Sequence, residues 1–157
     1  MLRISKLTDY ATVVLACLAD APAERHSAAD VASRTGVAPP TVAKLLKELH
    51  KSGLVRSTRG ARGGYALARP AASISAAEII DAVEGPVGLT ECSSHPGQCE
   101  IEGSCRVGGA WQRVNDAIRY ALGEVKLTQL TGADARPIRA PNLRGHLEVP
   151  VIWRGRV

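Results

Sequence analysis

The sequence predicts a mainly α-helical protein with one small β-hairpin, the hairpin being followed later in the chain by a long helix. Three observations support this fold class. Apolar residues recur at helical spacing in several segments. Aromatic residues make up only 3% of the chain and phenylalanine is absent, so the core must be built from Leu, Val, Ile and Ala, which favours small helices. Two short runs of alternating apolar residues flank a turn rich in glycine and arginine, which is typical of a hairpin.

Three helices are expected before the hairpin. The first spans about residues 6–19, and its apolar side consists of Leu7, Ala11, Val14, Leu15 and Leu18. The second spans about residues 28–34, and Ser27 with Asp30 forms a capping box at its start. The third spans about residues 39–51 and begins with two prolines, which a first helical turn accepts without losing a hydrogen bond. Its buried side is expected to contain Val42, Leu45, Leu46 and Leu49.

The hairpin follows directly after the third helix. Residues 54–57 and 65–68 alternate in polarity and are joined by a long basic loop. The order helix, helix, helix, hairpin is that of a winged helix. The second and third helices, joined by a short turn at Gly36, form a helix-turn-helix. The fold class is therefore mostly α with a small β-hairpin wing, and we expect a winged helix-turn-helix domain over residues 1–70.

The remaining chain is predicted to hold two further helices. A fourth helix spans about residues 75–84, and a segment rich in Gly, Ser and Cys follows it over residues 85–107. The fifth helix spans about residues 109–125. Its apolar seam consists of Trp111, Val114, Ile118, Ala121 and Val125. A seam of about two heptads can join two chains when other contacts support it, so we assign residues 71–131 to a cysteine-bearing loop and a dimerisation helix. Residues 132–157 are expected to form a flexible basic tail.

Basic residues are concentrated in the predicted winged domain. Residues 1–70 contain 11 Lys and Arg against 5 Asp and Glu, residues 71–125 contain 3 against 8, and residues 126–157 contain 6 against 2. A basic module of this kind is suited to binding a polyanion. No run approaches ~18 uninterrupted apolar residues, and the start of the chain lacks a signal-peptide pattern because Asp9 interrupts its apolar run. We therefore expect a cytoplasmic protein.

The third predicted helix is the candidate for base recognition. The second helix of a helix-turn-helix enters the major groove with its N-terminal residues nearest the base edges. Those residues include Pro40, Thr41 and Lys44. The Thr41 hydroxyl can donate or accept at a base edge or a phosphate, and Lys44 can reach guanine or phosphate. Lys47 and Lys51 are expected to neutralise the DNA backbone, although the lysines alone could also be the solvated face of an ordinary helix.

The loop of the hairpin adds a second candidate contact with double-stranded DNA. Arg59 and Arg62 lie among glycines, which let the backbone approach a ligand closely. Two guanidinium groups on such a loop can enter a narrow minor groove. This arrangement predicts that the wing contacts DNA.

The cysteines point to a metal or redox site. Cys92, Cys99 and Cys105 fall within fourteen residues, and a tight odd-numbered cluster in a reducing cytosol argues against a disulfide framework. The spacing lacks the paired knuckles of a zinc finger, and three thiolates suit an iron–sulfur cluster with a labile fourth position. Three free thiols or a structural zinc are the alternatives. Cys17 lies among apolar helix residues and is expected to be inert core.

Three residues near the cysteines could complete the ligand set. They are Glu91, His95 and Glu100. Imidazole has the chemistry of a cluster ligand, but a lone histidine in a loop is more often only solvated.

These motifs together resemble the Rrf2 family of bacterial regulators. The resemblance covers about residues 1–130 and rests on the opening MLRISKLTDYA, on GLVRSTRGARGGYALAR, on ISAAEIIDAVEG and on the three cysteines that follow. It implies a winged-helix dimer with each cluster loop near the DNA-binding domain of the other chain, and it gives the ligand role to Cys92, Cys99 and Cys105. The opening MLRISKLTDYAT is most similar to the SUF-system branch, whose members control genes for iron–sulfur cluster assembly.

The sequence departs from one branch of that family and matches another. IscR-like members place a histidine three residues after the last cysteine, where this chain has Gly108. NsrR-like members carry an aspartate in the first helix, and Asp9 matches it. The resemblance therefore implies Asp9 as the fourth ligand, although an acidic residue there also interacts favourably with the helix dipole. Both a 2Fe–2S and a 4Fe–4S cluster are compatible with this set.

Taken together, the sequence predicts a homodimeric transcription regulator whose affinity for a near-palindromic operator is set by an iron–sulfur cluster. A nitric-oxide- or redox-sensing repressor on the same scaffold is the alternative within the fold. A DNA-binding module with a structural zinc is a second alternative. A small redox enzyme using Cys99 and Cys105 is disfavoured, because the chain lacks C-x-x-C spacing and any cofactor fingerprint.

Overall fold

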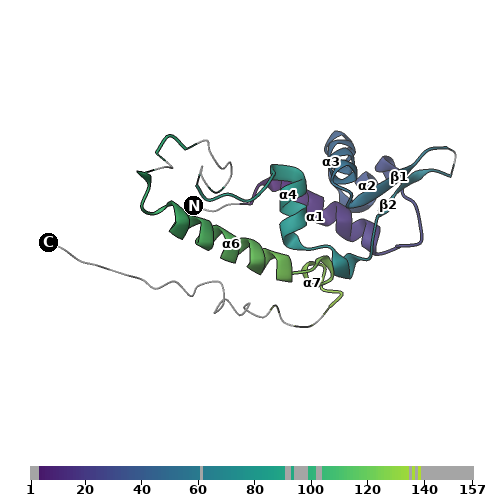
Figure 1. The fold of residues 1–157 in the computed structure, drawn as a ribbon. Coiled ribbons are helices and arrows are strands. Elements are labelled where there is room, and N and C mark those ends of the chain that lie inside the picture. Colours follow the sequence, from purple (N-terminus) through teal and green to yellow (C-terminus); the bar gives the residue numbers. More distant parts are fainter. Residues whose placement is uncertain are drawn as a thin grey trace.

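The computed structural model describes residues 4–60, 62–90, 93, 99–101, 104–134, 136 and 138 (Figure 1). Within them the five predicted helices and the hairpin are present, each within one residue of its expected bounds. The elements, in order, are α1 (Lys6–Ala19), α2 (Ala28–Thr35), α3 (Pro39–Lys51), β1 (Val55–Thr58), β2 (Gly64–Leu67), the short 3-10 turn η1 (Ala71–Ser73), α4 (Ala76–Glu84), α6 (Gly108–Glu124) and α7 (Leu127–Leu130). The mostly helical winged helix-turn-helix is thereby confirmed.

Local capping explains the bounds of the first two helices. The Ser5 hydroxyl accepts a hydrogen bond from the Thr8 N–H and so begins α1. Both halves of the capping box between Ser27 and Asp30 are formed at the start of α2. Gly36 ends α2 with φ of +70°, a left-handed conformation that costs a glycine little. The turn between the two helices of the helix-turn-helix is therefore encoded locally.

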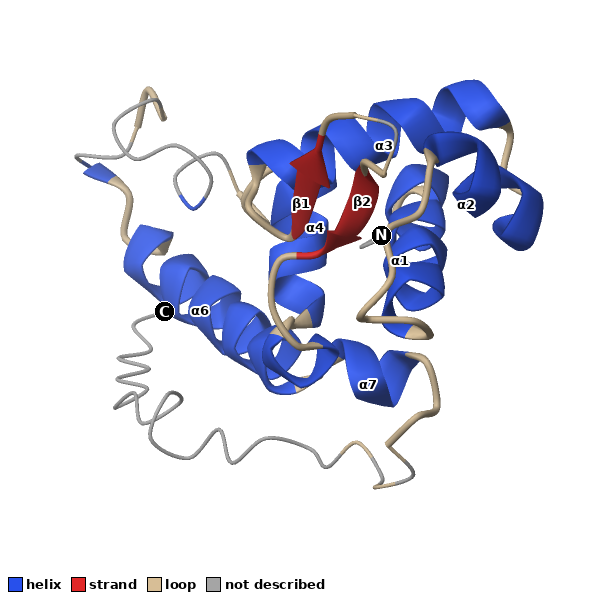
Figure 2. Cartoon of the chain, turned by 90° about the vertical axis from the view of Figure 1, so that its right-hand side faces the viewer, coloured by secondary structure: helices blue, strands red, loops and turns tan. Residues whose placement is uncertain are grey.

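One apolar core joins α1, α2, α3, the hairpin and the beginning of α4. Its largest fully buried side chains include Leu15, Leu18, Leu45, Leu46, Leu49, Leu54, Ile74 and Ile79. Leu127 of α7 belongs to the same cluster, whereas no described residue of α6 does. The buried residues of α6 are Asn115 and Ala117, and the helix packs against α4. The long helix is thus attached to the edge of the winged domain rather than built into its core, as Figure 2 also shows.

The hairpin is anchored by a residue that precedes α2. The N–H of His26 donates to the carbonyl of Tyr65 at 2.9 Å, and the N–H of Tyr65 donates back at 2.8 Å. Gly64 has φ of +146°, and a Cβ there would lie 2.8 Å from the His26 carbonyl oxygen. Only glycine allows this close approach at the start of β2, so the backbone fixes the wing against the loop between α1 and α2.

Four of the five residues of the predicted apolar seam lie in α6, and the fifth, Val125, lies just beyond its end. Trp111 and Val114 are exposed, and Ile118 and Ala121 are partly buried. The expectation that Val125 lies within the helix is wrong. Val125 has extended backbone angles, and its carbonyl accepts the Ala76 N–H at 2.8 Å, which takes the chain out of the helix.

The one-turn helix α7 was not predicted, because its four residues carry no helical period that a sequence could reveal. Most of the predicted tail lies outside the described residues, and the division into segments at residues 70 and 131 stays a prediction. In the described part of the chain, no helix combines the length and apolar character needed to cross a membrane.

Candidate DNA-binding face and cysteine-bearing segment

The third helix presents one basic side to solvent. Its buried side is formed by Val42, Leu45, Leu46 and Leu49, all fully buried in the core. The opposite side carries Lys44, Lys47 and Lys51, all exposed. Lys51 is paired with Glu48 at 3.0 Å, so part of its charge is already compensated within α3. Lys44 and Lys47 form no ion pair with any described residue and are the stronger candidates for phosphate contacts.

The beginning of α3 offers no free backbone donor at its first three positions. Pro39 and Pro40 lack an N–H, and the Thr41 N–H donates to the Ala38 carbonyl at 2.9 Å. The N-terminal turn of a helix usually binds phosphate through such donors. Within the described residues, the Thr41 hydroxyl has no hydrogen-bond partner, and Pro40 beside it is exposed. Any contact of these three positions with DNA would therefore have to use side chains.

The hairpin carries a second group of uncompensated cations. Arg56, Arg59 and Arg62 are exposed, and none of them is in an ion pair with a residue that the structure describes. Gly60 has φ of +107°, a conformation that suits the turn between Arg59 and Arg62. The loop thus holds two guanidinium groups away from the protein body, at the tip of the hairpin.

Two of the three clustered cysteines lie near the start of α6. Cys99 and Cys105 are free thiols and partly buried, whereas Cys92 lies outside the described residues. A Cβ at Gly108 would lie 3.7 Å from the Cys105 sulfur. A side chain at that position would therefore be close enough to bind a metal held by Cys105, but glycine supplies no donor. In Figure 1 this segment lies at the opposite end of the molecule from the tip of the hairpin.

Asp9 shares no cavity with Cys99 or Cys105 of its own chain. Its side chain is exposed on the first turn of α1 and lines a cavity of about 760 Å³ that α4, α6 and α7 also line. Neither Cys99 nor Cys105 lines this cavity. Over the described residues, no three His, Cys, Asp or Glu side chains are grouped closely enough to hold a metal ion. Glu100 is exposed, while Glu91 and His95 fall outside the described residues, so the choice of fourth ligand stays a prediction.

Cys17 has the environment of a structural cysteine. It is 7% exposed within the main core, and burial is the chief cause that raises the pKa of its thiol. A raised pKa keeps the sulfur protonated and unreactive at neutral pH.

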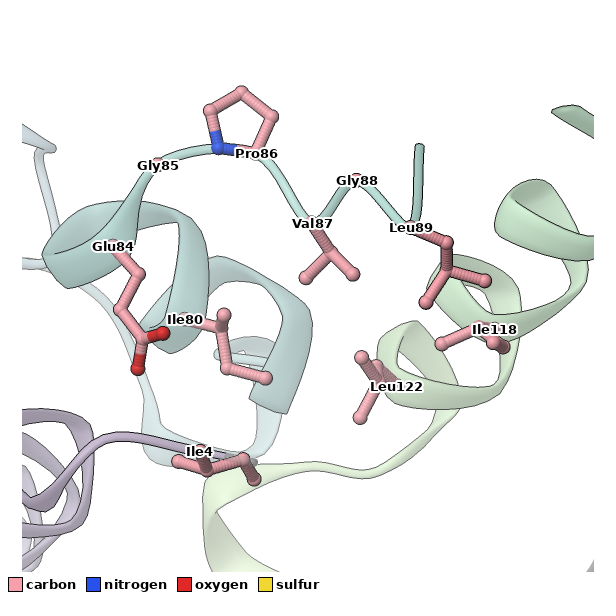
Figure 3. A pocket seen from close by; sticks show the side chains of 10 residues that line it. All are labelled: Ile4, Ile80, Glu84, Gly85, Pro86, Val87, Gly88, Leu89, Ile118 and Leu122. Carbon is pink, nitrogen blue, oxygen red and sulfur yellow. The ribbon is translucent and has the colours of Figure 1, made fainter. Parts of the chain in front are cut away.

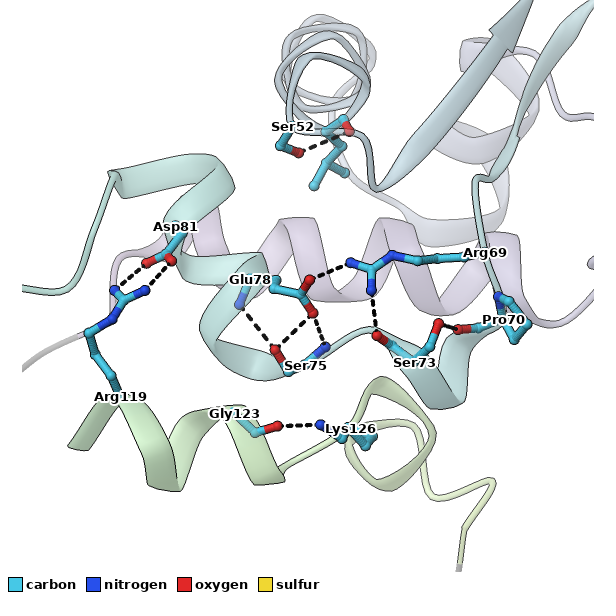
Figure 4. A network of polar contacts seen from close by, with 11 residues as sticks. Ser52, Arg69, Pro70, Ser73, Ser75, Glu78, Asp81, Arg119, Gly123 and Lys126 are labelled. Carbon is cyan, nitrogen blue, oxygen red and sulfur yellow. Dashed lines mark hydrogen bonds and ion pairs between the residues drawn. The ribbon is translucent and has the colours of Figure 1, made fainter. Parts of the chain in front are cut away.

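Sequence reasoning missed a group of polar residues between α4 and α6. Arg119 donates to both carboxylate oxygens of Asp81, at 2.9 and 2.7 Å (Figure 4). Asn115 is 5% exposed, and its side-chain oxygen accepts the Leu89 N–H at 3.3 Å. A polar residue at an inward position of an amphipathic helix was the available signal for Asn115. No local signal pairs Asp81 with a residue 38 positions away.

Known transcription regulators resemble this chain in sequence and in fold. Residues 4–133 match the model of the Rrf2 family, described as an iron-dependent transcriptional regulator. The HTH-type transcriptional regulator IscR of Xenorhabdus nematophila is 36% identical over 102 residues, and that of Escherichia coli O1:K1 is 34% identical over 102 residues. Each match covers 65% of this chain and 62% of the relative, so the match spans less than two thirds of those proteins.

Solved structures of transcription regulators have the same fold as this chain. The structure of CymR, the global cysteine regulator of Bacillus subtilis, superposes with a TM-score of 0.64 and 28% identity, over 85% of this chain and 99% of that one. The structure of T. potens IscR superposes with a TM-score of 0.61 and 28% identity, over 85% and 90% of the two chains. These proteins are transcription regulators rather than enzymes, and their winged-helix fold is the DNA-binding fold found here. The match over residues 4–133 shows that this chain belongs to the Rrf2 family of transcriptional regulators.

Proposed function

We propose that this regulator binds double-stranded DNA with α3 in the major groove and the hairpin loop in the adjacent minor groove. The observation that carries the proposal is that α3 and the hairpin both carry exposed basic residues. Lys44, Lys47, Arg59 and Arg62 are free of ion pairs within the described residues. Their charges are available to displace counterions from DNA, which supplies much of the affinity of such proteins. Thr41 is the candidate for direct contact with a base edge.

A second copy of the chain completes the DNA-binding unit in this proposal. Trp111 is 46% exposed and Val114 is 38% exposed on α6, which contributes nothing to the main core within the described residues. An exposed aromatic and aliphatic pair on a helix of 17 residues favours contact with an equivalent helix. Two chains related by a two-fold axis would present two copies of α3, so the operator is expected to be a near-palindrome.

An iron–sulfur cluster on Cys92, Cys99 and Cys105 is the proposed signal receiver. The donor set fits, because thiolates are the ligands that such clusters prefer and Cys99 and Cys105 are not joined in a disulfide. When bound, the group would supply a link that iron starvation, oxidation or nitrosylation can break. In this proposal, the bound cysteines hold the segment before α6 in place. Helix α6 in turn sets the spacing of the two DNA-binding domains.

Asp9 is the proposed fourth ligand, supplied by the second copy of the chain. Its carboxylate is exposed, and the cavity that it lines contains neither Cys99 nor Cys105 of its own chain. Gly108 cannot supply the donor. The cluster is 2Fe–2S or 4Fe–4S. By resemblance to the SUF-system branch, the proposed targets are genes for iron–sulfur cluster assembly.

The sensing proposal is tested by an anaerobic absorption spectrum of fresh protein, with iron, sulfide and zinc assayed on the same sample. Visible bands with equal iron and sulfide are expected, together with a change of about tenfold in operator affinity when the cluster is removed, which corresponds to about 1.4 kcal/mol. Cys105→Ser should abolish the bands, while Cys17→Ala serves as the control. Colourless protein with stoichiometric zinc would contradict the proposal.

A nitric-oxide-sensing repressor is the second candidate function, favoured by the combination of Asp9 with Gly108. It differs from the first in its signal rather than in its fold. Release from the operator should then follow nitric oxide at low equivalents and not iron chelation. Comparing the two treatments on the same loaded protein separates the candidates.

A further inference from the structure

Residues 87–89, which precede Cys92, form hydrogen bonds with both α4 and α6. The Val87 N–H donates to the Asp81 carboxylate of α4 at 3.4 Å, and the Leu89 N–H donates to the Asn115 side chain of α6 at 3.3 Å. The side chains of Val87 and Leu89 point toward Ile118 and Leu122 of α6 in Figure 3. Residues 87–89 are therefore joined to both helices by hydrogen bonds, and their apolar side chains line a cavity together with Ile118 and Leu122.

The two anchoring side chains are themselves connected. Arg119 lies one helical turn after Asn115, and its two terminal nitrogens bind both oxygens of Asp81. The pair is partly buried, with exposed side-chain fractions of 35% for Arg119 and 29% for Asp81. Two parallel hydrogen bonds of this type fix the angle as well as the distance between their helices. We refer to Asp81, Asn115 and Arg119 as the α4–α6 clamp.

The other end of α4 is tied to the hairpin. Arg69, two residues after β2, donates to the Glu78 carboxylate and, at 2.6 Å, to the Ser73 carbonyl. Glu78 also accepts the N–H and hydroxyl of Ser75, which begins α4. Figure 4 shows both ion pairs along the same helix, one turn apart. One helix of nine residues is thus bonded to the exit of the wing and to the segment that leads into the cysteines.

We propose that Asp81, Asn115 and Arg119 are positioning residues that transmit the state of the cysteine-bearing segment to the hairpin through α4. This inference rests on the proposed function. A displacement of residues 87–89 strains or breaks the hydrogen bonds to Asp81 and Asn115, and a rotation of α4 displaces Glu78 relative to Arg69. Helix α4 also packs against α3, so the same motion reaches both DNA-binding elements. A rigid helix tied at both ends is a physical connection of the kind that coupling between distant sites requires.

The test uses the whole chain with and without its cluster, in four α6 variants, one of which is Arg119→Lys. Asn115→Leu removes the acceptor for Leu89 and keeps the volume. Arg119→Gln removes the ion pair, and Arg113→Gln removes a charge from the same helix at an exposed position, which makes it the matched control. Operator affinity is measured in both states, and hydrogen exchange is followed at residues 64–69 and 87–89.

The expected result is a loss of coupling without a loss of the cluster. Asn115→Leu and Arg119→Gln should keep the wild-type visible spectrum and iron content, while the affinity ratio between the two states falls from about tenfold to below about threefold. Cluster loading should change exchange at residues 64–69 in wild type and Arg113→Gln but not in the two clamp variants. Arg119→Lys, which keeps the charge but cannot bind both oxygens in parallel, should give an intermediate ratio.

Other outcomes overturn the inference. If both clamp variants keep the wild-type affinity ratio and hydrogen-exchange pattern, the clamp does not transmit the state of the cysteine-bearing segment to the hairpin. If wild-type protein binds a cluster whose loading leaves residues 64–69 unchanged, the inference fails while the cluster proposal stands. If no cluster forms, the proposed function fails, and alkylation of the loop cysteines with iodoacetamide replaces loading as the perturbation. A response at residues 64–69 in wild type that the clamp variants lack then supports the clamp, and its absence refutes it.

Discussion

Glu84 caps the beginning of α1 although it belongs to α4. Its carboxylate accepts the Ser5 N–H at 3.0 Å and also accepts the Thr8 hydroxyl. The hydrogen bond from Thr8 is the main cause that lowers the pKa of Glu84 from its ordinary value of 4.5. A lowered folded-state pKa means that the stabilising contribution is complete above about pH 4.5 and is lost as the pH falls through the lower folded value.

Glu84→Gln should therefore reduce the acid sensitivity of the fold. The amide keeps an acceptor for Ser5 but does not titrate, so the difference in unfolding midpoint between pH 7 and pH 4 should become smaller than in wild type. The effect will be modest because the side chain is largely exposed. Urea unfolding at the two pH values measures it. Glu24→Gln, at an exposed carboxylate, is the control, and identical pH profiles for the two variants would contradict the assignment.

Ser27 makes both halves of the capping box at the start of α2. Its hydroxyl accepts the Asp30 N–H at 3.1 Å, and the Asp30 carboxylate accepts the Ser27 N–H at 3.1 Å. Ser27→Ala leaves the Asp30 N–H without its acceptor and should lower the free energy of unfolding by about 1 kcal/mol. Ser33→Ala, at an exposed position within α2, should be neutral or slightly stabilising. Denaturant unfolding measures both variants. An equal loss in the free energy of unfolding for the two would contradict the assignment of Ser27 as a cap.

At the scale of elements, substitutions in the hairpin loop are expected to change DNA affinity without changing the stability of the fold. Arg59 and Arg62 are exposed and support no other part of the fold. Replacing either by alanine should weaken operator binding and reduce the slope of log affinity against log salt by about 0.9 for each lost phosphate contact. The unfolding midpoint should not change. Arg113→Ala on α6 removes the same charge away from the wing and should leave the slope unaltered. A reduced slope in that control would show that net charge alone is responsible.

The winged domain was predictable because its signals are local. Ser27, Asp30 and Gly36 define the turn between α2 and α3 within ten residues, so the sequence alone places both helices. The contact of Arg119 with Asp81 and the burial of Asn115 depend instead on how α6 lies against α4, which no local pattern specifies. Val125 continued the apolar spacing of the helix, but its carbonyl accepts a hydrogen bond from the Ala76 N–H and its backbone is extended. The basic residues of the candidate DNA face were found from the sequence because exposure, charge and helix order suffice to place them.

At the scale of the whole molecule, the start of α6 and the hairpin proposed to contact DNA lie at opposite ends of one chain (Figure 1). Helix α6 is the element that begins beside Cys105 and returns to the winged domain through α7. Its exposed Trp111 and Val114 are the proposed contact with a second chain. Such a dimer would place the start of α6 in each chain, next to Cys105, beside the other chain rather than in open solvent.

Trp111→Arg should shift the protein toward monomer. The substitution places a charge in the centre of the proposed contact, where an aromatic side chain contributes a large share of binding energy, and we expect the dissociation constant to rise by about tenfold or more. Gln112→Arg adds the same charge at the next exposed position of α6 and is the matched control. Sedimentation velocity over a concentration series measures both. A wild-type dimer that neither variant weakens would place the interface elsewhere.

The two prolines that begin α3 have a consequence for changing the specificity of the protein. Pro39 and Pro40 leave the proposed recognition helix without the backbone donors that would otherwise hold it on the phosphate chain independently of the side chains. In the proposed complex, the docking of α3 then depends on replaceable groups such as the Thr41 hydroxyl and the Lys44 ammonium. A library varied at those two positions is therefore expected to select new operators without first having to overcome a fixed docking register.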